Sequence, residues 1–301
     1  MASKAQANAM SFKHILLAIA VTAIWGFNFV VIHWGLGDMP PLLLSAMRFV
    51  VAALPALFFV KRPQISWGVL AAITFFHVSQ FNLLFVGMYA GLPAGIASIV
   101  IQLQAFFTVL LAAVWLGEKP SGRQIAGMVL AFAGMAVIAL SKGGSGTLVG
   151  LALTIAGGFS WAITNILMKR AGSIDMIALF VWVAALGAVP MFAVSYLVEG
   201  PDQIWSALTN LSMQGGLSII FMAYGATIFG FGVWGILLHH YQAARVASFS
   251  LLVPVFGMAA AALLLGEQFT SDRILAAVLV LAGLYLVVIR KKRSFMPRST
   301  N

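Results

Sequence analysis

The sequence predicts an all-α integral membrane protein whose ten transmembrane helices form two inverted five-helix repeats. Three observations predict this fold class: the composition, ten long apolar stretches, and a phrase that occurs twice. Of the 301 residues, 62% are hydrophobic and only 8% are charged, whereas soluble domains have about 25% charged residues. Such a chain cannot cover itself with polar groups in water, so we expect lipid to be its solvent.

Each of the ten apolar stretches is long enough for a helix that crosses a bilayer, which takes about 20 residues. Turn-forming residues separate most of them. In chain order the predicted spans are His14–Trp34, Leu42–Val60, Trp67–Ala90, Ala94–Leu116, Arg123–Leu140, Leu148–Met168, Met176–Val198, Gly215–His239, Ala243–Leu265 and Arg273–Ile289. An insert around Ile204–Leu211 is predicted to lie along the outer interface, with Trp205 as its anchor.

The basic residues predict the orientation, because Lys and Arg collect in cytoplasmic loops. With a cytoplasmic N-terminus and alternating spans, fourteen of the seventeen Lys and Arg residues lie on the cytoplasmic side. Only Lys142 and Arg273 lie on the other side, and Arg48 lies within the second span. We expect a multi-pass protein of the cell inner (plasma) membrane with both termini cytoplasmic. The net charge of +10 therefore reflects a solvated rim near lipid headgroups and not a nucleic-acid surface.

The repeated phrase predicts the domain organisation. "LGEKPSGRQIAGMVLAFAG" begins at Leu116 and "LGEQFTSDRILAAVLVLAG" begins at Leu265. Each copy ends a set of five spans, and five is an odd number, so the second copy must cross the membrane in the opposite sense. We therefore expect two repeats, residues 1–141 and 142–301, in the inverted arrangement that recurs in secondary transporters.

Polar side chains inside the spans predict a central cavity, because hydrocarbon offers them no partner. They gather on the first, third, fourth, sixth, eighth and ninth predicted helices, so we expect these helices to line the cavity. The candidate substrate-binding residues are His77, Trp161, Gln80, Gln102, Asn165, Trp25, Asn28 and Tyr224.

Several of these residues also have a structural interpretation. The neutral imidazole of His77 can both donate and accept a hydrogen bond, and an imidazole ordinarily titrates near neutral pH; a satisfied core histidine is the alternative. Trp25 and Trp161 lie well inside their spans and not at the interface, although either residue is also a plausible packing residue. For Asn28 and Asn165 we favour hydrogen bonds that clamp two helices. We expect Arg48 to cap carbonyl groups or to reach outward to the interface, and not to contact substrate.

The absence of carboxylates from the predicted spans limits the class of substrate that we expect. All seven carboxylates fall in predicted loops or at helix ends: Asp38, Glu118, Asp175, Glu199, Asp202, Glu267 and Asp272. Antiporters of cationic drugs need a buried carboxylate, and strongly anionic substrates need several basic groups. This pattern favours a neutral or zwitterionic small molecule. The chain has no cysteine and no HExxH motif, so we expect no enzymatic activity, no metal and no cofactor.

Two halves that each end in "LGE" and then "G…L…AG" resemble the drug/metabolite transporter superfamily, and within it the ten-helix EamA-type branch. "SAMRF" at Ser45 resembles the second-helix signature of that branch. The chain is most similar to the YddG-type amino-acid exporters. The resemblance implies a probable exporter of amino acids, including aromatic ones, that works by alternating access around a central pathway. A channel-like pore and a carrier for another metabolite class are the alternatives.

Backbone weak points predict where the helices bend. Pro254 removes a helical hydrogen bond and should kink the ninth helix. Members of the family usually have a proline in the fourth helix as well, but Gln104 stands at the corresponding position here. Gly91 and Pro93 form a second candidate hinge between the third and fourth helices. Because one chain holds both repeats, we expect a working monomer.

Overall fold

The computed structural model describes residues 10–140, 145–172, 174–241, 243–268 and 270–288. Within these residues every regular element is helical, and ten helical stretches are long and apolar enough to span a membrane. The predictions of an all-α chain and of ten spans are confirmed. The predicted boundary between the two repeats, at residues 141 and 142, lies outside the described residues, as do Lys142 and the basic residues at positions 290–293.

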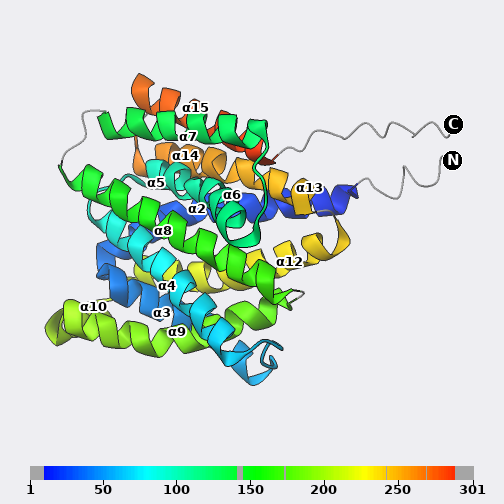
Figure 1. Cartoon of the computed structure of the whole chain (residues 1–301). Helices are drawn as coiled ribbons and strands as arrows, with labels where there is room; N and C mark the ends of the chain where they lie inside the picture. The colour runs from blue at the N-terminus through cyan, green and yellow to red at the C-terminus, as the bar shows by residue number, and fades with distance from the viewer. Residues whose placement is uncertain (1–9, 141–144, 173, 242, 269, 289–301) are drawn as a thin grey trace, which may run out of the picture.

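In chain order (Figure 1) the spans are α2 (Phe12–Asp38); α3 (Pro41–Ala53) with the 3-10 turn η1 (Ala56–Phe58); α4 (Trp67–Tyr89); α5 (Ala94–Val100), η2 (Ile101–Leu103) and α6 (Gln104–Leu116); α7 (Gly122–Leu140); α8 (Ser145–Ala171); α9 (Met176–Val198); α11 (Met213–Ile220), η3 (Phe221–Phe229) and α12 (Gly230–His240); α13 (Ala243–Ser248), η4 (Phe249–Leu251) and α14 (Leu252–Leu265); and α15 (Ser271–Val288). The insert between the seventh and eighth spans forms a short helix, α10 (Pro201–Thr209), on which Trp205 is exposed.

The repeated "LGE" phrase has a structural cause. Gly117 ends α6 and Gly266 ends α14, both in the left-handed conformation, with φ of 68° and 65°. Glycine adopts this conformation without the steric penalty that a Cβ atom imposes, and it commonly follows the last turn of a helix. Gly91 has the same function in the turn after α4, where its φ is 97°, and Pro93 directly precedes α5.

The fourth and ninth spans are both broken near their middle. The ninth span contains the 3-10 turn η4 just before Pro254, where the sequence predicts a kink. The fourth span contains the 3-10 turn η2 just before Gln104, although no proline stands there. The two broken segments contact each other, since Gln102 Nε2 donates to the backbone carbonyl of Ser250 at 3.1 Å. The break in the fourth span therefore accompanies a tertiary contact between the two halves.

Corresponding helices of the two halves make corresponding contacts. The first span, α2, packs on α14 of the ninth, and its counterpart α8 packs on α5, η2 and α6 of the fourth. Likewise α4 packs on α8, and α2 packs on α11, η3 and α12. The pairs α3·α9 and α7·α15 join each helix to its own counterpart on opposite flanks of the bundle (Figure 1). Such reciprocal contacts are what a two-fold relationship between two similar units produces.

Glycines allow the two halves to approach closely. A Cβ atom at Gly127 of α7 would lie 2.5 Å from the backbone oxygen of Gly283 of α15, and a Cβ atom at Gly283 would lie 2.4 Å from that of Gly127. Because small residues at helix contacts let backbones pack directly in lipid, this pair fixes the distance between the two helices.

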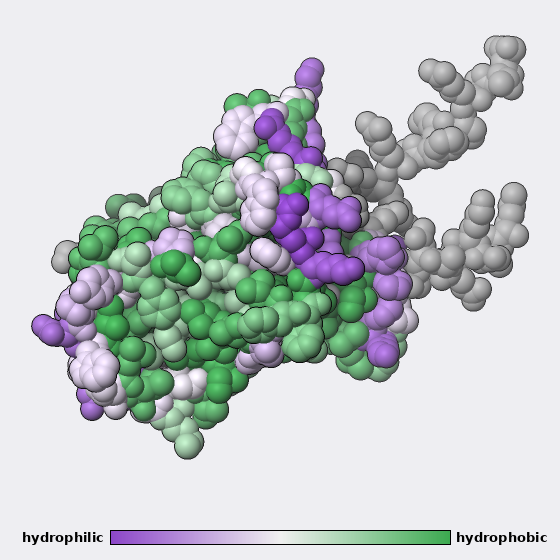
Figure 2. Space-filling model, turned by 90° about the horizontal axis from the view of Figure 1, so that it is seen from below, coloured by the Kyte–Doolittle hydropathy of each residue, from purple (hydrophilic) through white to green (hydrophobic). Residues whose placement is uncertain are grey.

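Apolar side chains cover much of the outside of the bundle. Figure 2 shows a mostly hydrophobic face between two ends where hydrophilic side chains gather. Large apolar residues are exposed on several spans, among them Phe75, Val114, Val189 and Leu263. A soluble monomer rarely exposes so much contiguous apolar surface, so the surface fits a lipid environment.

Replacing Gly127 by Ala should destabilise the bundle, because the new methyl group meets the backbone of α15 and not a flexible side chain. We expect the midpoint of thermal unfolding in detergent to fall, with a cost of about 1–3 kcal/mol. Gly122→Ala is the matched control on the same helix, since nothing lies within 4 Å of its new methyl group. Equal midpoints for the two variants would contradict the proposed role of Gly127.

Candidate functional site

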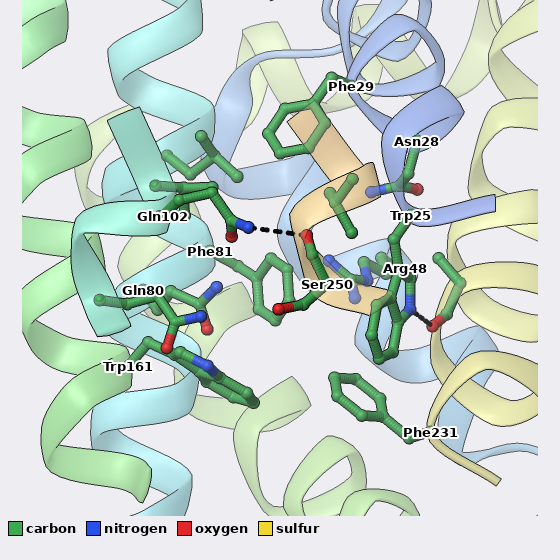
Figure 3. A pocket seen from close by; sticks show the side chains of 15 residues that line it. Trp25, Asn28, Phe29, Arg48, Gln80, Phe81, Gln102, Trp161, Phe231 and Ser250 are labelled. Atoms are coloured by element: carbon green, nitrogen blue, oxygen red, sulfur yellow. Dashed lines mark hydrogen bonds between the residues drawn. The ribbon is translucent and has the colours of Figure 1, made fainter. Parts of the chain in front are cut away.

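A cavity of about 140 Å³ lies in the middle of the bundle. Residues of both halves line it, and they come from all six helices that the sequence analysis selects and from the second span as well. Its polar and aromatic lining residues (Figure 3) are Trp25, Asn28, Phe29, Arg48, Gln80, Phe81, Gln102, Gln104, Trp161, Phe231 and Ser250. The cavity therefore combines amide groups, one guanidinium and a set of aromatic rings.

Five of the eight candidate residues lie at this cavity. They are Trp25, Asn28, Gln80, Gln102 and Trp161. Their side chains converge on the cavity from the first, third, fourth and sixth spans (Figure 3).

The indole of Trp25 is held in the cavity wall by the eighth span. Its Nε1 donates to the backbone carbonyl of Ala226 at 2.9 Å. Ala226 belongs to η3, a π-helical segment of nine residues, and such segments are rare and frequent at functional sites. Gly230 leaves room for the ring, since a Cβ atom there would lie 2.5 Å from Trp25 Nε1.

Aromatic rings beside Trp25 form another part of the cavity wall, since the centroids of Trp25 and Phe231 are 5.4 Å apart. The centroids of Phe180 and Phe231 are 4.0 Å apart in a stacked pair, and Trp161 stacks on Phe180 at 6.3 Å. His77 lies behind this wall and not at the cavity, with its ring centroid 5.1 Å from that of Trp161 and 4.9 Å from that of Phe180. It is 1% exposed, and its Nδ1 has no hydrogen-bond partner.

Two further candidates lie away from the cavity lining. Asn165 donates to Gln104 Oε1 at 3.0 Å and to Thr108 Oγ1 at 3.2 Å, so it joins α8 to α6 and orients the cavity residue Gln104. The Tyr224 hydroxyl donates to the backbone carbonyl of Leu54 at 2.6 Å, and the residue is 38% exposed. Periodicity placed both residues on polar helix faces, but those faces meet neighbouring helices and not the cavity.

Arg48 lies inside the bundle, so the expectation that it reaches outward is wrong. The residue is 1% exposed and lines the cavity. Its Nη2 donates to Thr227 Oγ1 at 2.9 Å, and its guanidinium carbon lies 3.7 Å from the centroid of the Phe81 ring. These two partners hold the side chain inside the bundle. Because an ionisable residue within a span marks a functional site by default, the sequence did contain the signal.

The carboxylates at one end of the bundle join the two halves. Glu199 follows α9 and accepts from the backbone N–H groups of Leu42 and Leu43 at the start of α3, at 2.6 and 2.9 Å. Glu267 follows α14 and accepts from Ala94 and Gly95 at the start of α5, at 2.7 and 3.1 Å. Both satisfy helix N-termini that have no intrahelical partner.

Glu118 of the first repeat corresponds to Glu267 in the repeated phrase, but it has a different partner. Glu118, in the first "LGE", forms an ion pair with Lys169 of α8 at 2.5 Å, and both side chains are about half exposed, at 52% and 54%. An exposed pair of this kind contributes little stability. The two ends of the bundle are therefore joined by different interactions, although the motif is the same.

The described residues contain no group of three or more His, Cys, Asp or Glu side chains that could hold a metal ion. The cavity lining includes no carboxylate. Its chemistry is therefore hydrogen bonding, a single positive charge and aromatic contact.

Comparison with known proteins agrees with this architecture. The model of the EamA-like transporter family matches twice, over residues 12–140 and 148–289. The "Probable amino-acid metabolite efflux pump" of Escherichia coli (strain K12) is 42% identical over 286 residues, which cover 93% of this chain and 96% of the relative. The protein of the same name in Salmonella typhimurium is 43% identical with the same coverage. An "Uncharacterized transporter" of Archaeoglobus fulgidus is 31% identical and covers 92% of this chain and 98% of its own.

One solved crystal structure shows the fold at greater distance. It is 15% identical, superposes with a TM-score of 0.61, and covers 92% of this chain and 96% of that chain. The two family matches cover the first five and the last five of the ten spans. This chain belongs to the EamA-like transporter family and is a multi-pass membrane protein.

Proposed function

We propose that this protein exports small zwitterionic metabolites, above all amino acids and including aromatic ones, by alternating access around the central cavity. The observation that carries the proposal is the cavity itself, which is lined by residues of both halves and presents the buried polar side chains of Asn28, Arg48 and Gln80. The relatives in Escherichia coli and Salmonella typhimurium are named probable amino-acid metabolite efflux pumps, which supports the same substrate class and direction.

The lining of the cavity supports a substrate with little net charge. No carboxylate is present to attract a cationic drug, and Arg48 is the single basic lining residue. The faces and edges of Trp25, Phe81, Trp161 and Phe231 offer contact area for an apolar or aromatic side chain. The amides of Gln80 and Gln102 supply the polar complement.

Alternating access requires the two ends of the bundle to open in turn. We place residues 1–141 and 142–301 as inverted repeats with both termini in the cytoplasm, so Glu199 and Glu267 lie at the outer end. There each glutamate of the second repeat binds a helix start of the first. These contacts hold the outer end closed, and they must break before the cavity opens outward.

The backbone offers places where this motion can occur. The fourth and ninth spans are interrupted at η2 and η4, next to the cavity. Pro254 lies beside the second interruption, and Gly91 and Pro93 lie in the turn that precedes the fourth span. Bending at these residues lets each half move as a unit. The chain supplies every wall of the cavity, so a monomer suffices for transport.

Counterflow in liposomes tests the proposal. The purified protein is reconstituted, the vesicles are loaded with one unlabelled amino acid at a time, and uptake of the labelled amino acid is followed. We expect saturable exchange. Flux that does not saturate, or single-channel currents, would favour a channel-like pore. Exchange of other metabolites but of no amino acid would favour a different substrate class.

Trp161→Ala should reduce the initial rate of exchange by about tenfold or more, because it removes a wall of the cavity and the ring on which Phe180 stacks. Tyr224→Phe is the matched comparison. It removes a hydrogen bond to Leu54 outside the cavity lining, so the rate per inserted protein should stay within about twofold of the wild type. A normal rate for Trp161→Ala, with normal insertion, would remove this residue from the site.

Glu267→Gln should loosen the outer end, because a neutral amide replaces a carboxylate that accepts two backbone hydrogen bonds. The chain has no native cysteine, so Ser250→Cys places a single reporter thiol in the cavity. In whole cells, a membrane-impermeant maleimide should label this thiol faster when Glu267→Gln is added.

Glu118→Gln in the same reporter background is the control, since Glu118 contacts Lys169 and no helix start of the outer end. It should not increase labelling from outside. If the two glutamine variants label at the same rate as the reporter alone, Glu267 does not hold the outer end closed.

A further inference from the structure

We infer that Arg48 binds the carboxylate of the substrate, and that the side-chain oxygens of Asn28 and Gln80 accept from its ammonium group. The cavity would then select a free α-amino acid head group, with both charges unmodified. This inference rests on the proposed function and assigns roles within the same cavity.

The basic side chain of Arg48 is buried without a carboxylate partner in the cavity. The guanidinium is buried, and its Nε and Nη1 atoms have no hydrogen-bond partner. All seven carboxylates of the chain lie near the ends of spans or in connectors, and none lines the cavity. A buried charge without a partner is costly. The Phe81 ring, with its centroid 3.7 Å from the guanidinium carbon, gives only partial compensation.

The hydrogen bond between Arg48 and Thr227 has a defined direction. Thr227 donates its hydroxyl proton to the backbone carbonyl of Met222 at 2.8 Å. Its oxygen is therefore free to accept from Arg48 Nη2 at 2.9 Å. This arrangement fixes the guanidinium and leaves its remaining donors for a ligand. Carboxylates are the small organic anions that guanidinium binds through paired hydrogen bonds.

Two residues that line the same cavity, Asn28 and Gln80, have unpaired amide oxygens. Asn28 Oδ1 and Gln80 Oε1 are both buried and have no hydrogen-bond partner. Buried polar atoms in proteins are nearly always paired, and rotation of each amide about its last side-chain bond turns its oxygen toward the cavity, so we assign these two oxygens to a ligand that brings N–H donors. A primary ammonium has three donors and no acceptor. The faces of neighbouring Trp25 and Trp161 also attract a cation.

The unpaired groups of the cavity therefore match one head group. The donors of Arg48 need an anion, and the amide oxygens of Asn28 and Gln80 need a donor. Figure 3 shows Arg48 beside Phe81 and Trp25 at the centre of the view, with Asn28 and Gln80 on different sides of the cavity. A zwitterionic α-amino acid supplies both kinds of group on adjacent atoms.

The test measures binding by thermal stabilisation of the purified protein in detergent. The twenty standard L-amino acids are screened, and the tightest binder is compared with its carboxamide and its N-acetyl derivative. The carboxamide lacks the anion, and the N-acetyl derivative lacks the ammonium. We expect the free amino acid to bind about 30-fold or more tightly than either derivative.

Two substitutions assign the carboxylate contact to Arg48. In Arg48→Gln the preference for the free acid over the carboxamide should fall to about threefold or less, while the preference over the N-acetyl derivative remains. Arg48→Lys keeps the positive charge and should retain part of the preference for the free acid. This variant tests the carboxylate contact if Arg48→Gln does not fold. Arg62→Gln is the control, since Arg62 stacks on Trp67 outside the cavity, and it should leave both preferences unchanged.

The outcomes separate this inference from the proposed function. Saturable counterflow combined with an acid preference that neither Arg48 variant reduces would overturn the role of Arg48 and leave the transport function intact. Binding with an Arg48-dependent acid preference, but no counterflow, would overturn the transport function and support the binding role. A wild type that binds no amino acid, or that binds acid and carboxamide equally, would overturn the inference.

Discussion

The dominant constraint on this protein is that hydrocarbon provides no hydrogen-bond partner for a polar group. Ten helical spans satisfy the backbone internally, which is the solution that a bilayer allows. Irregular backbone in three of the spans is enclosed by the protein: the turns η2 and η4 and the π-helical η3 all contribute residues to the central cavity. The turn η1 at the end of the second span has no buried residue and does not line the cavity. The interruptions of the fourth, eighth and ninth spans therefore coincide with the central cavity.

The fold could be predicted from the sequence to the extent that it depends on hydropathy and repetition. Hydropathy predicts the ten spans because each is long and apolar, and turn residues separate most of them. The break in the ninth span was visible at Pro254, but the equivalent break at Ile101–Leu103 was not. It accompanies a contact between Gln102 and the carbonyl of Ser250, and no local signal reports a partner 148 residues away.

The site was predictable by helix and less so by residue. Periodicity identifies a polar face but not the neighbour that this face meets. Asn165 and Tyr224 therefore bind Gln104 and Leu54, and His77 lies one layer behind the cavity. Arg48 was misjudged for a related reason. Outward reach is the usual solution for a charge in a span, and the sequence does not reveal that Thr227 and Phe81 hold this one inside.

The two "LGE" motifs have the same sequence and end their helices in the same way, but their glutamates make different contacts. Gly117 and Gly266 end their helices in nearly the same conformation, so the local structure is shared. The following glutamates differ only in what they reach: Glu267 binds the start of α5, and Glu118 pairs with Lys169. In the proposed cycle the two ends must never be open together. In this structure the repeated motif binds a helix start at one end of the bundle and not at the other, which is the asymmetry that the proposed cycle requires.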